Sequence, residues 1–241
     1  MKKSQKIIIF DLDETLGYFT QLNLIWNDLI NRTNISPSQN NFFLLCDCFN
    51  EYFRKNIFEI LKFIHMKKKK KLIDKCIIYT NNNGDPSWTY LLKDYMEHKI
   101  KVKLFDLCIC AYNKNNVDNK RTTPFKCISD LEKILKINIE KTNICFIDDK
   151  EHPDMEHPHT FYIKIHPYYK EFNFTDINTK FKKCPFGTKF ENDNELNKFL
   201  EILKETINNN KLNLYNIDTS TPRKIKEGNL LFSKLYHFIL N

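Results

Sequence analysis

Apolar residues recur along the chain in two alternating patterns. Short apolar runs bounded by polar residues predict buried strands, over residues 6–10, 76–79, 102–111, 143–147 and 161–165. Apolar residues spaced three and four apart predict helices, over residues 21–31, 42–65, 86–97, 124–136 and 193–208. Strands that alternate with helices in this way predict a parallel sheet with helices on both of its faces.

The same pattern suggests how the chain is divided. We expect an α/β fold with a three-layer, Rossmann-like parallel sheet over residues 1–190. The stretch between the first strand and the helix near Phe53 is long enough for a small helical insertion at about residues 17–52. Residues 191–241 read as a C-terminal helical extension, whose apolar end at 230–240 either docks back on the domain or binds a partner.

Composition narrows the class of protein. The chain has 241 residues, of which 41% are hydrophobic and 28% charged, which excludes wholesale disorder. No apolar run approaches the ~20 residues of a membrane helix, and the run at residues 7–10 is too short for a signal peptide. We therefore expect an intracellular protein, cytoplasmic or nuclear, without a membrane partner. The net charge of +8 leans toward polyanionic partners, but Lys, Asn and Ile are abundant along the whole chain, which is equally the signature of an AT-rich coding sequence.

The chain contains eight cysteines, two pairs of which have the spacing Cys-x-Cys. None has the Cys-x-x-Cys spacing of a structural zinc site, and without a secretory signal no disulfide framework is implied. We expect reduced thiols that fill the core.

Polar residues follow three of the predicted strands. Asp11 and Asp13 follow the first strand, Thr80 the second, and Asp148 and Asp149 the fourth. Because parallel strands end at the same edge of a sheet, the four carboxylates are expected to crowd together. Such crowding is unfavourable unless a cation neutralises it. With oxygen ligands only, the natural cation is Mg²⁺.

These motifs, taken in order, resemble those of a known superfamily. The Asp-x-Asp-x-Thr at 11–15, Thr80, a lysine near the start of a later helix and the pair 148–149 are similar to the four motifs of haloacid dehalogenase (HAD)-like phosphatases, over roughly residues 6–170. The resemblance implies a Mg²⁺-dependent phosphomonoester hydrolase. In that chemistry Asp11 attacks phosphorus to form an aspartyl-phosphate. Asp13 protonates the leaving oxygen and then activates water, while Thr15 braces the loop.

The resemblance also implies the phosphate-binding groups. Thr80 and the backbone N–H of Asn81 bind phosphoryl oxygens, helped by a lysine. Lys126 is favoured for that lysine, because it stands 22 residues before the acidic pair and can occupy the first turn of a helix. Lys120 is the competitor.

Four acidic residues make up the implied metal site. Mg²⁺ would take the carboxylate of Asp11, the backbone carbonyl of Asp13 and one member of the pair Asp148 and Asp149. Asp149 is the expected direct ligand, with Asp148 orienting a metal-bound water, although the order within the pair stays open.

Finer features point to a branch of the superfamily. The run Phe10–Leu16 (FDLDETL) resembles the branch of RNA polymerase II carboxyl-terminal-domain (CTD) phosphatases and NLI-interacting-factor-like proteins. The Tyr-Thr-Asn-Asn, Arg-Thr-Thr and Asp-Asp-x-x-His-Pro runs resemble related uncharacterised proteins of large DNA viruses and protists. This resemblance and the small insertion favour a phosphorylated macromolecule as substrate, a Ser/Thr phosphoprotein first. The alternatives are a nucleic-acid-end or nucleotide phosphatase, and a non-catalytic HAD-fold binding protein.

Overall fold

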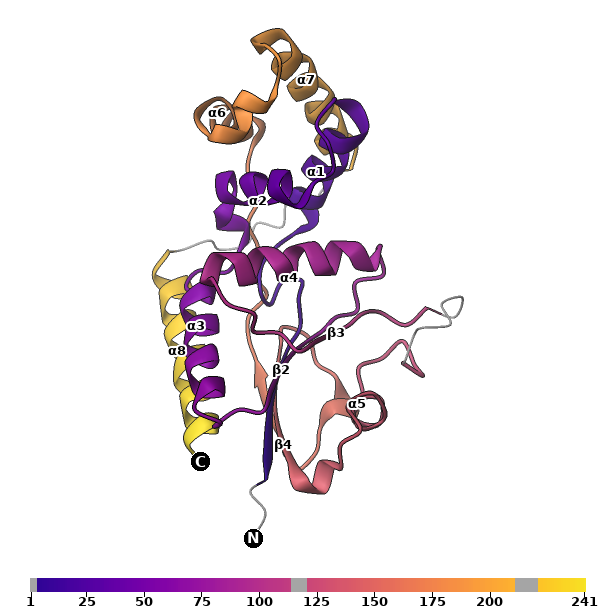
Figure 1. The fold of residues 1–241 in the computed structure, drawn as a ribbon, viewed down its shortest axis with the longest axis vertical. Helices are drawn as coiled ribbons and strands as arrows, with labels where there is room; N and C mark the ends of the chain where they lie inside the picture. Colours follow the sequence, from indigo (N-terminus) through magenta and orange to yellow (C-terminus); the bar gives the residue numbers. More distant parts are fainter. Residues whose placement is uncertain (1–3, 114–120, 211–220) are drawn as a thin grey trace. The chain divides into compact units, whose positions relative to one another are not determined.

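The computed structural model describes residues 4–113, 121–210 and 221–241, with the backbone only for 221–229 (Figure 1). These residues form two compact units. The first comprises the described residues of Met1–Leu16, Arg54–Tyr168 and Ser220–Asn241, and the second those of Gly17–Phe53 and Tyr169–Thr219. Lys120 lies outside the described residues.

The first unit is built on one parallel sheet. Its order is β3-β2-β1-β4-β5, and every neighbouring pair is parallel. The strands are β1 (Gln5–Phe10), β2 (Lys75–Tyr79), β3 (Leu107–Ile109), β4 (Thr142–Asp148) and β5 (Thr160–Lys164). The predicted three-layer α/β fold is confirmed, although the third strand is shorter than expected.

Helices cover both faces of this sheet (Figure 1). They are α3 (Ile57–Lys69), α4 (Pro86–Ile100), α5 (Ile128–Leu135) and α8 (Thr221–Leu240), with the 3₁₀ turns η2 (Ile139–Lys141) and η3 (Pro153–Met155). Because successive strand residues point to opposite faces, Ile7 and Ile9 of β1 face α5, where they pack in one core with Leu131 and Leu135. Helices α3 and α8 lie side by side, with the rings of Phe63 and Phe232 4.6 Å apart.

The C-terminal apolar segment docks back on the first unit. Leu231, Leu235 and Ile239 of α8 are buried. The ammonium of Lys6 donates hydrogen bonds to the carbonyls of Phe238 (3.2 Å) and Ile239 (3.0 Å). Of the two sequence-based alternatives for this segment, docking is therefore the one observed.

The second unit is entirely helical. It contains α1 (Thr20–Arg32), α2 (Gln39–Cys48), η1 (Asn50–Tyr52), α6 (Phe174–Lys183), η4 (Pro185–Lys189) and α7 (Asp193–Asn209). The expected helical insertion after β1 is present as α1 and α2. Its core is aromatic: the ring of Phe181 packs at 5.4 Å from Phe49, 6.0 Å from Phe186 and 5.6 Å from Phe199.

Three sequence-based expectations differ from this structure. The helix expected over 42–65 is interrupted, because the chain turns between α2 and α3, where Asn56 adopts a left-handed backbone conformation (φ 64°). Helix α6 was not predicted. The insertion forms its unit together with Tyr169–Thr219, so the structure does not divide at residue 190.

The expectation for the cysteines is wrong for two of the eight. Cys48 and Cys184 form a disulfide within the second unit, between the end of α2 and the residue that follows α6. Nothing in their spacing signals the pairing, because 136 residues separate them. The other six are free thiols. Among the described residues, no helix has the length and apolar character needed to cross a membrane.

Candidate functional site

The order of the strands brings the motif residues together. Strand β1 lies between β2 and β4, and the backbone N–H of Asp11 donates to the carbonyl of Ile147 (2.9 Å) as the chain leaves the sheet. Asp11 thus follows β1 where Asp148 ends β4. In open parallel sheets, the place where the chain reverses its winding direction leaves a crevice at the carboxyl ends of the strands. The site lies in such a place.

A buried lysine joins the first and fourth motifs. The ammonium of Lys126 contacts the carboxylate of Asp11 and, at 2.7 Å, that of Asp148. It also lies over the rings of Tyr79 (5.8 Å) and Phe146 (5.7 Å). Lys126 is only 2% exposed, and lysines are almost never buried so fully unless they are paired.

The reason that favoured Lys126 in the sequence was wrong, although its position is the expected one. Helix α5 begins at Ile128, and its N-cap is Cys127 in an extended conformation. Lys126 therefore precedes the helix and does not occupy its first turn. Its side chain reaches the acidic residues from the loop that leads into α5.

Asp148 has partners for both of its carboxylate oxygens. Oδ2 receives Lys126 and lies 3.1 Å from Nε2 of His152, and Oδ1 accepts the backbone N–H of Lys150 (2.8 Å). Burial works in the opposite direction, but His152, Lys126 and the Lys150 N–H outweigh it and hold the pKa of Asp148 below its usual value. Asp148 is thus kept ionised.

Asp149 is less completely paired. Its Oδ1 accepts a hydrogen bond from the hydroxyl of Thr15 (3.1 Å), so Thr15 ties the loop after β1 to the loop after β4. Its Oδ2 has no hydrogen-bond partner among the residues that the structure describes. Burial, together with the charges of Asp148 and Glu14, raises the pKa of Asp149 to about 6.

Burial disfavours the ionised form of Asp11. Burial raises its pKa to about 7, even though Lys126 lowers it, and the charges of Asp148 and Asp13 raise it further. Its Oδ2 likewise has no hydrogen-bond partner within the described part of the chain. A second positive charge at this site would relieve both Asp11 and Asp149.

Asp11, Asp148 and Asp149 form a buried acidic cluster that could hold a metal ion. One carboxylate oxygen from each lies within 4.8 Å of the others. All three donors are hard oxygen ligands, which suit a hard divalent cation such as Mg²⁺ or Ca²⁺. The two unpartnered oxygens, on Asp11 and Asp149, are available for coordination.

Asp13 lies outside this cluster and has its own partner. The side-chain amide of Asn82 donates to Oδ2 of Asp13 at 2.8 Å. Burial raises the pKa of Asp13 above its usual value, although the Asn82 hydrogen bond opposes the shift. Asn82 had no predicted role. Its contact with Asp13 depends on the path of the loop after β2, which no sequence spacing reports.

Thr80 and Asn81 are fixed by Arg121, the arginine of the Arg-Thr-Thr run, to which the sequence assigned no role. One guanidinium nitrogen of Arg121 donates to the Thr80 carbonyl (3.2 Å) and to Oδ1 of Asn81 (2.8 Å). Arg121 is buried over the ring of Tyr79 (4.8 Å). The side chain of Asn81 thus faces Arg121. The Thr80 hydroxyl accepts the N–H of Asn82 (3.0 Å), which leaves its own proton free to donate.

Arg54 was also missed, and it holds the loop that carries Asp11 and Asp13. It donates to the carbonyls of Thr15 (2.6 Å), Glu14 (2.7 Å) and His166 (2.7 Å). Glu14 has a left-handed backbone (φ 61°), a conformation that persists only where the surroundings fix it. The sequence around Arg54 gave no signal of this role, because its partners are backbone carbonyls.

Comparison with known proteins adds no further constraint. No protein-family model matches the chain, and neither a curated protein nor a solved structure is significantly similar to it. The functional argument therefore depends on the site itself.

Proposed function

We propose that this protein is a Mg²⁺-dependent phosphomonoester hydrolase of the HAD type, which works through an aspartyl-phosphate intermediate. The observation that carries the proposal is the buried arrangement of Asp11, Lys126, Asp148 and Asp149 at the carboxyl edge of the sheet. A carboxylate with a raised pKa beside a fixed ammonium, in a position that suits ligand binding, is a candidate nucleophile.

In the first step Asp11 supplies the electron pair. One of its carboxylate oxygens forms a bond to phosphorus while the bond from phosphorus to the ester oxygen breaks. Phosphoryl transfer depends mainly on positioning and on charge stabilisation. Lys126, already placed at Asp11, supplies positive charge there, and the free hydroxyl proton of Thr80 supplies a donor for a phosphoryl oxygen.

Asp13 supplies and then removes the proton. Its raised pKa favours a protonated carboxyl, which gives its proton to the departing alkoxide. In the second step the resulting carboxylate takes a proton from water as that water attacks phosphorus. The bond from Asp11 to phosphorus breaks, inorganic phosphate leaves, and both residues return to their starting state.

Asp11 and Asp149 would hold the metal, because each has an oxygen that is not engaged by the described residues. When bound, Mg²⁺ offsets the negative charge shared by the nucleophile and the phosphoryl group. Asp148 is committed to Lys126, His152 and the Lys150 N–H. This supports Asp149 as the direct ligand and Asp148 as the residue that positions Lys126.

The proposed substrate is a phosphoprotein carrying phosphoserine or phosphothreonine. The similarity of residues 10–16 to the CTD-phosphatase branch supports it, and so does the net charge of +8, which suits an anionic macromolecule. The same charge suits the end of a nucleic acid, which the experiments therefore include.

The test is hydrolysis of p-nitrophenyl phosphate by the full chain with and without Mg²⁺. Asp11→Asn is expected to lower the rate by roughly 10³-fold or more. Asp193→Asn, an exposed position in the first turn of α7, is the matched control and should retain the wild-type rate. Equal rates for wild type and Asp11→Asn, or no rate at all, would refute the enzymatic proposal.

Substrate class is then tested with phosphoserine peptides, nucleotides and 3′-phosphorylated DNA at equal concentration. The peptides are expected to give the highest kcat/KM. A higher value for the DNA would replace the phosphoprotein by a nucleic-acid end.

A further inference from the structure

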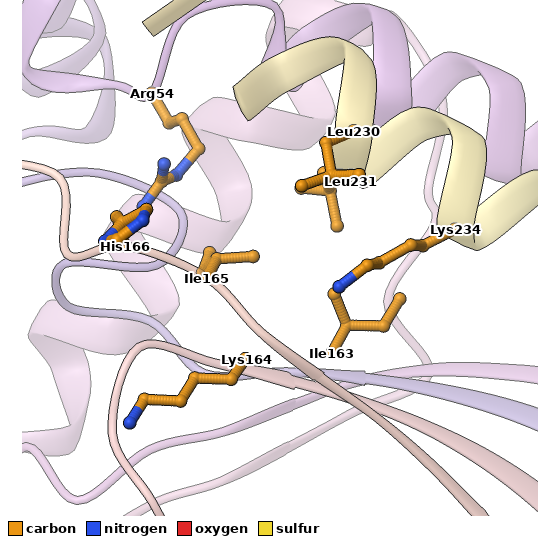
Figure 2. A pocket seen from close by; sticks show the side chains of 8 residues that line it. All are labelled: Arg54, Ile163, Lys164, Ile165, His166, Leu230, Leu231 and Lys234. Carbon is orange, nitrogen blue, oxygen red and sulfur yellow. The ribbon is translucent and has the colours of Figure 1, made fainter. Parts of the chain in front are cut away.

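The first unit has a cavity of about 250 Å³ between the end of β5 and α8 (Figure 2). Its floor is aliphatic, and its remaining walls carry basic groups or histidine. The eight described residues that line it are Arg54, Ile163, Lys164, Ile165, His166, Leu230, Leu231 and Lys234. None of them is acidic and, apart from the imidazole of His166, none has an aromatic ring.

Two of these residues connect the cavity to the loops of the site. The backbone N–H of Ile165 donates to the carbonyl of Asp148 (3.0 Å). Arg54 donates to the carbonyls of Glu14 and Thr15, in the loop that carries Asp13. Residues that line the cavity therefore also contact both loops that carry the acidic residues.

Lys234 gives the cavity its charge. It is half-buried on α8, and in Figure 2 its side chain extends over Ile163 at the rim of the cavity. Neither an ion pair nor a hydrogen bond joins it to any residue that the structure describes. Lys164, by contrast, is paired with Glu151. An ammonium above an apolar floor favours a ligand that has an apolar group followed by an anion.

The volume of the cavity and the residues that line it favour a small aliphatic group over an unpaired base. Pockets for cofactors and drug-sized molecules span roughly 300–1,000 Å³, so this cavity suits one or two side chains. Proteins that bind unpaired bases usually stack them on aromatic rings, and the floor here is made of Ile and Leu.

We propose that this cavity is a docking subsite for a substrate protein: it receives an aliphatic side chain, and Lys234 pairs with an acidic residue directly after it. As a statement about substrate choice, this rests on the proposed phosphoprotein phosphatase function. Docking of an unphosphorylated segment near the acidic loops would raise the local concentration of a phosphorylated residue elsewhere in the same chain.

The test measures binding without turnover. The probe is a fluorescein-labelled Gly-Ser peptide with one Leu followed by two Asp, titrated with the full-length protein and followed by fluorescence anisotropy. Saturable binding is expected, weaker by about tenfold or more when Leu is replaced by Ser in the peptide. Lys234→Glu should weaken binding of the acidic peptide by about tenfold and should favour a Leu-Lys-Lys peptide instead.

The matched control is Lys62→Glu, an exposed lysine on α3, which should change the affinity less than twofold. If Lys234→Glu does not fold, Leu230→Ala replaces it, because Leu230 is 55% exposed, and it too should weaken binding. No saturable binding to wild type, or equal effects of Lys234→Glu and Lys62→Glu, would overturn the subsite.

Three further outcomes separate the subsite from the phosphatase. A single-stranded oligonucleotide that binds more tightly than the peptide, with the same dependence on Lys234, would overturn the peptide assignment. Peptide binding without any hydrolysis of p-nitrophenyl phosphate would refute the phosphatase and leave a docking site. Hydrolysis without peptide binding would refute the subsite alone.

Discussion

Replacing Lys126 with Met should show how much its ammonium stabilises the buried carboxylates of the site. The substitution keeps the length of the side chain but removes the ammonium that contacts Asp11 and Asp148. Removing one partner of a buried ion pair costs about 3–5 kcal/mol, because the other partner stays buried and charged. We expect a loss of this size in the free energy of unfolding of the metal-free protein at pH 8.

The loss should depend on pH. The pKa of Asp11 is about 7 in the folded wild type, above its ordinary value of 3.8. Stability from this group is therefore present below about pH 4 and is lost as the pH rises through 7. Without Lys126 the pKa of Asp11 in the folded protein rises further. The variant therefore loses more of its free energy of unfolding than the wild type does as the pH rises above 7. At pH 5.5 Asp11 is protonated in both proteins, so the charged partner that Lys126→Met leaves without its ammonium is Asp148, at a cost of about 1.5–3 kcal/mol.

The assay is urea denaturation at pH 5.5 and pH 8, with EDTA and with Mg²⁺. Lys133→Met, at an exposed position on α5, is the control and should change stability by no more than about 0.5 kcal/mol. Mg²⁺ should narrow the gap between Lys126→Met and wild type at pH 8. A Lys126→Met protein as stable as wild type at pH 8, or a cost that is equal at the two pH values, would refute the reasoning.

Three other predictions concern the metal, the disulfide and a glycine. Protons compete for Asp11 and Asp149, whose pKa values are about 7 and 6, so Mg²⁺ affinity measured by calorimetry should fall by about tenfold or more from pH 8 to pH 5.5. Reducing the bond between Cys48 and Cys184 should destabilise the helical unit by about 2–4 kcal/mol, measured by urea denaturation with and without reductant. Gly17→Ala should cost about 1–3 kcal/mol in the same assay, because its Cβ would lie 2.5 Å from a backbone oxygen.

Each of these three predictions has a result that would contradict it. A Mg²⁺ affinity independent of pH would mean that the two carboxylates are not ligands. Alkylation of eight thiols in the unreduced protein, where six are expected, would exclude the disulfide. Gly84→Ala should cost less than Gly17→Ala, because its Cβ would meet only a side-chain atom, Oδ1 of Asn82, at 3.1 Å. An equal loss in the two glycine variants would remove the steric explanation.

The sheet could be predicted because each strand is recognisable from a run of neighbouring residues. An Ile-rich run that ends in Asp11 reads as a strand that ends at a polar edge, and the parallel order follows from alternation with helices. The lysine was found by its distance from Asp148, but the helix that was expected to present it begins two residues later. The position of the ammonium depends on the loop, whose path the spacing does not describe.

The missing parts of the site are those that depend on tertiary contacts. Arg54 acts through backbone carbonyls that lie far away in sequence, 112 residues in its contact with His166, and Arg121 reaches the Thr80 carbonyl across 41 residues. A carbonyl has the same chemistry at every residue, so no residue type marks the partner. The disulfide was not predicted for a related reason, because its two cysteines come together only when α2 and α6 have packed.

The paired and unpaired carboxylates together explain why the acidic cluster suits a divalent cation. Asp11, Asp148 and Asp149 carry three negative charges when ionised, against the one positive charge of Lys126. The remaining charge is 3 − 1 = 2, and it falls on Asp11 and Asp149, the two residues whose pKa values are raised. Buried charges of this kind are neutralised by protons or by a cation. Asp148, with its lowered pKa, keeps Lys126 in place whichever of the two is bound. The ammonium is therefore held in place without a ligand, as the proposed phosphoryl transfer would require.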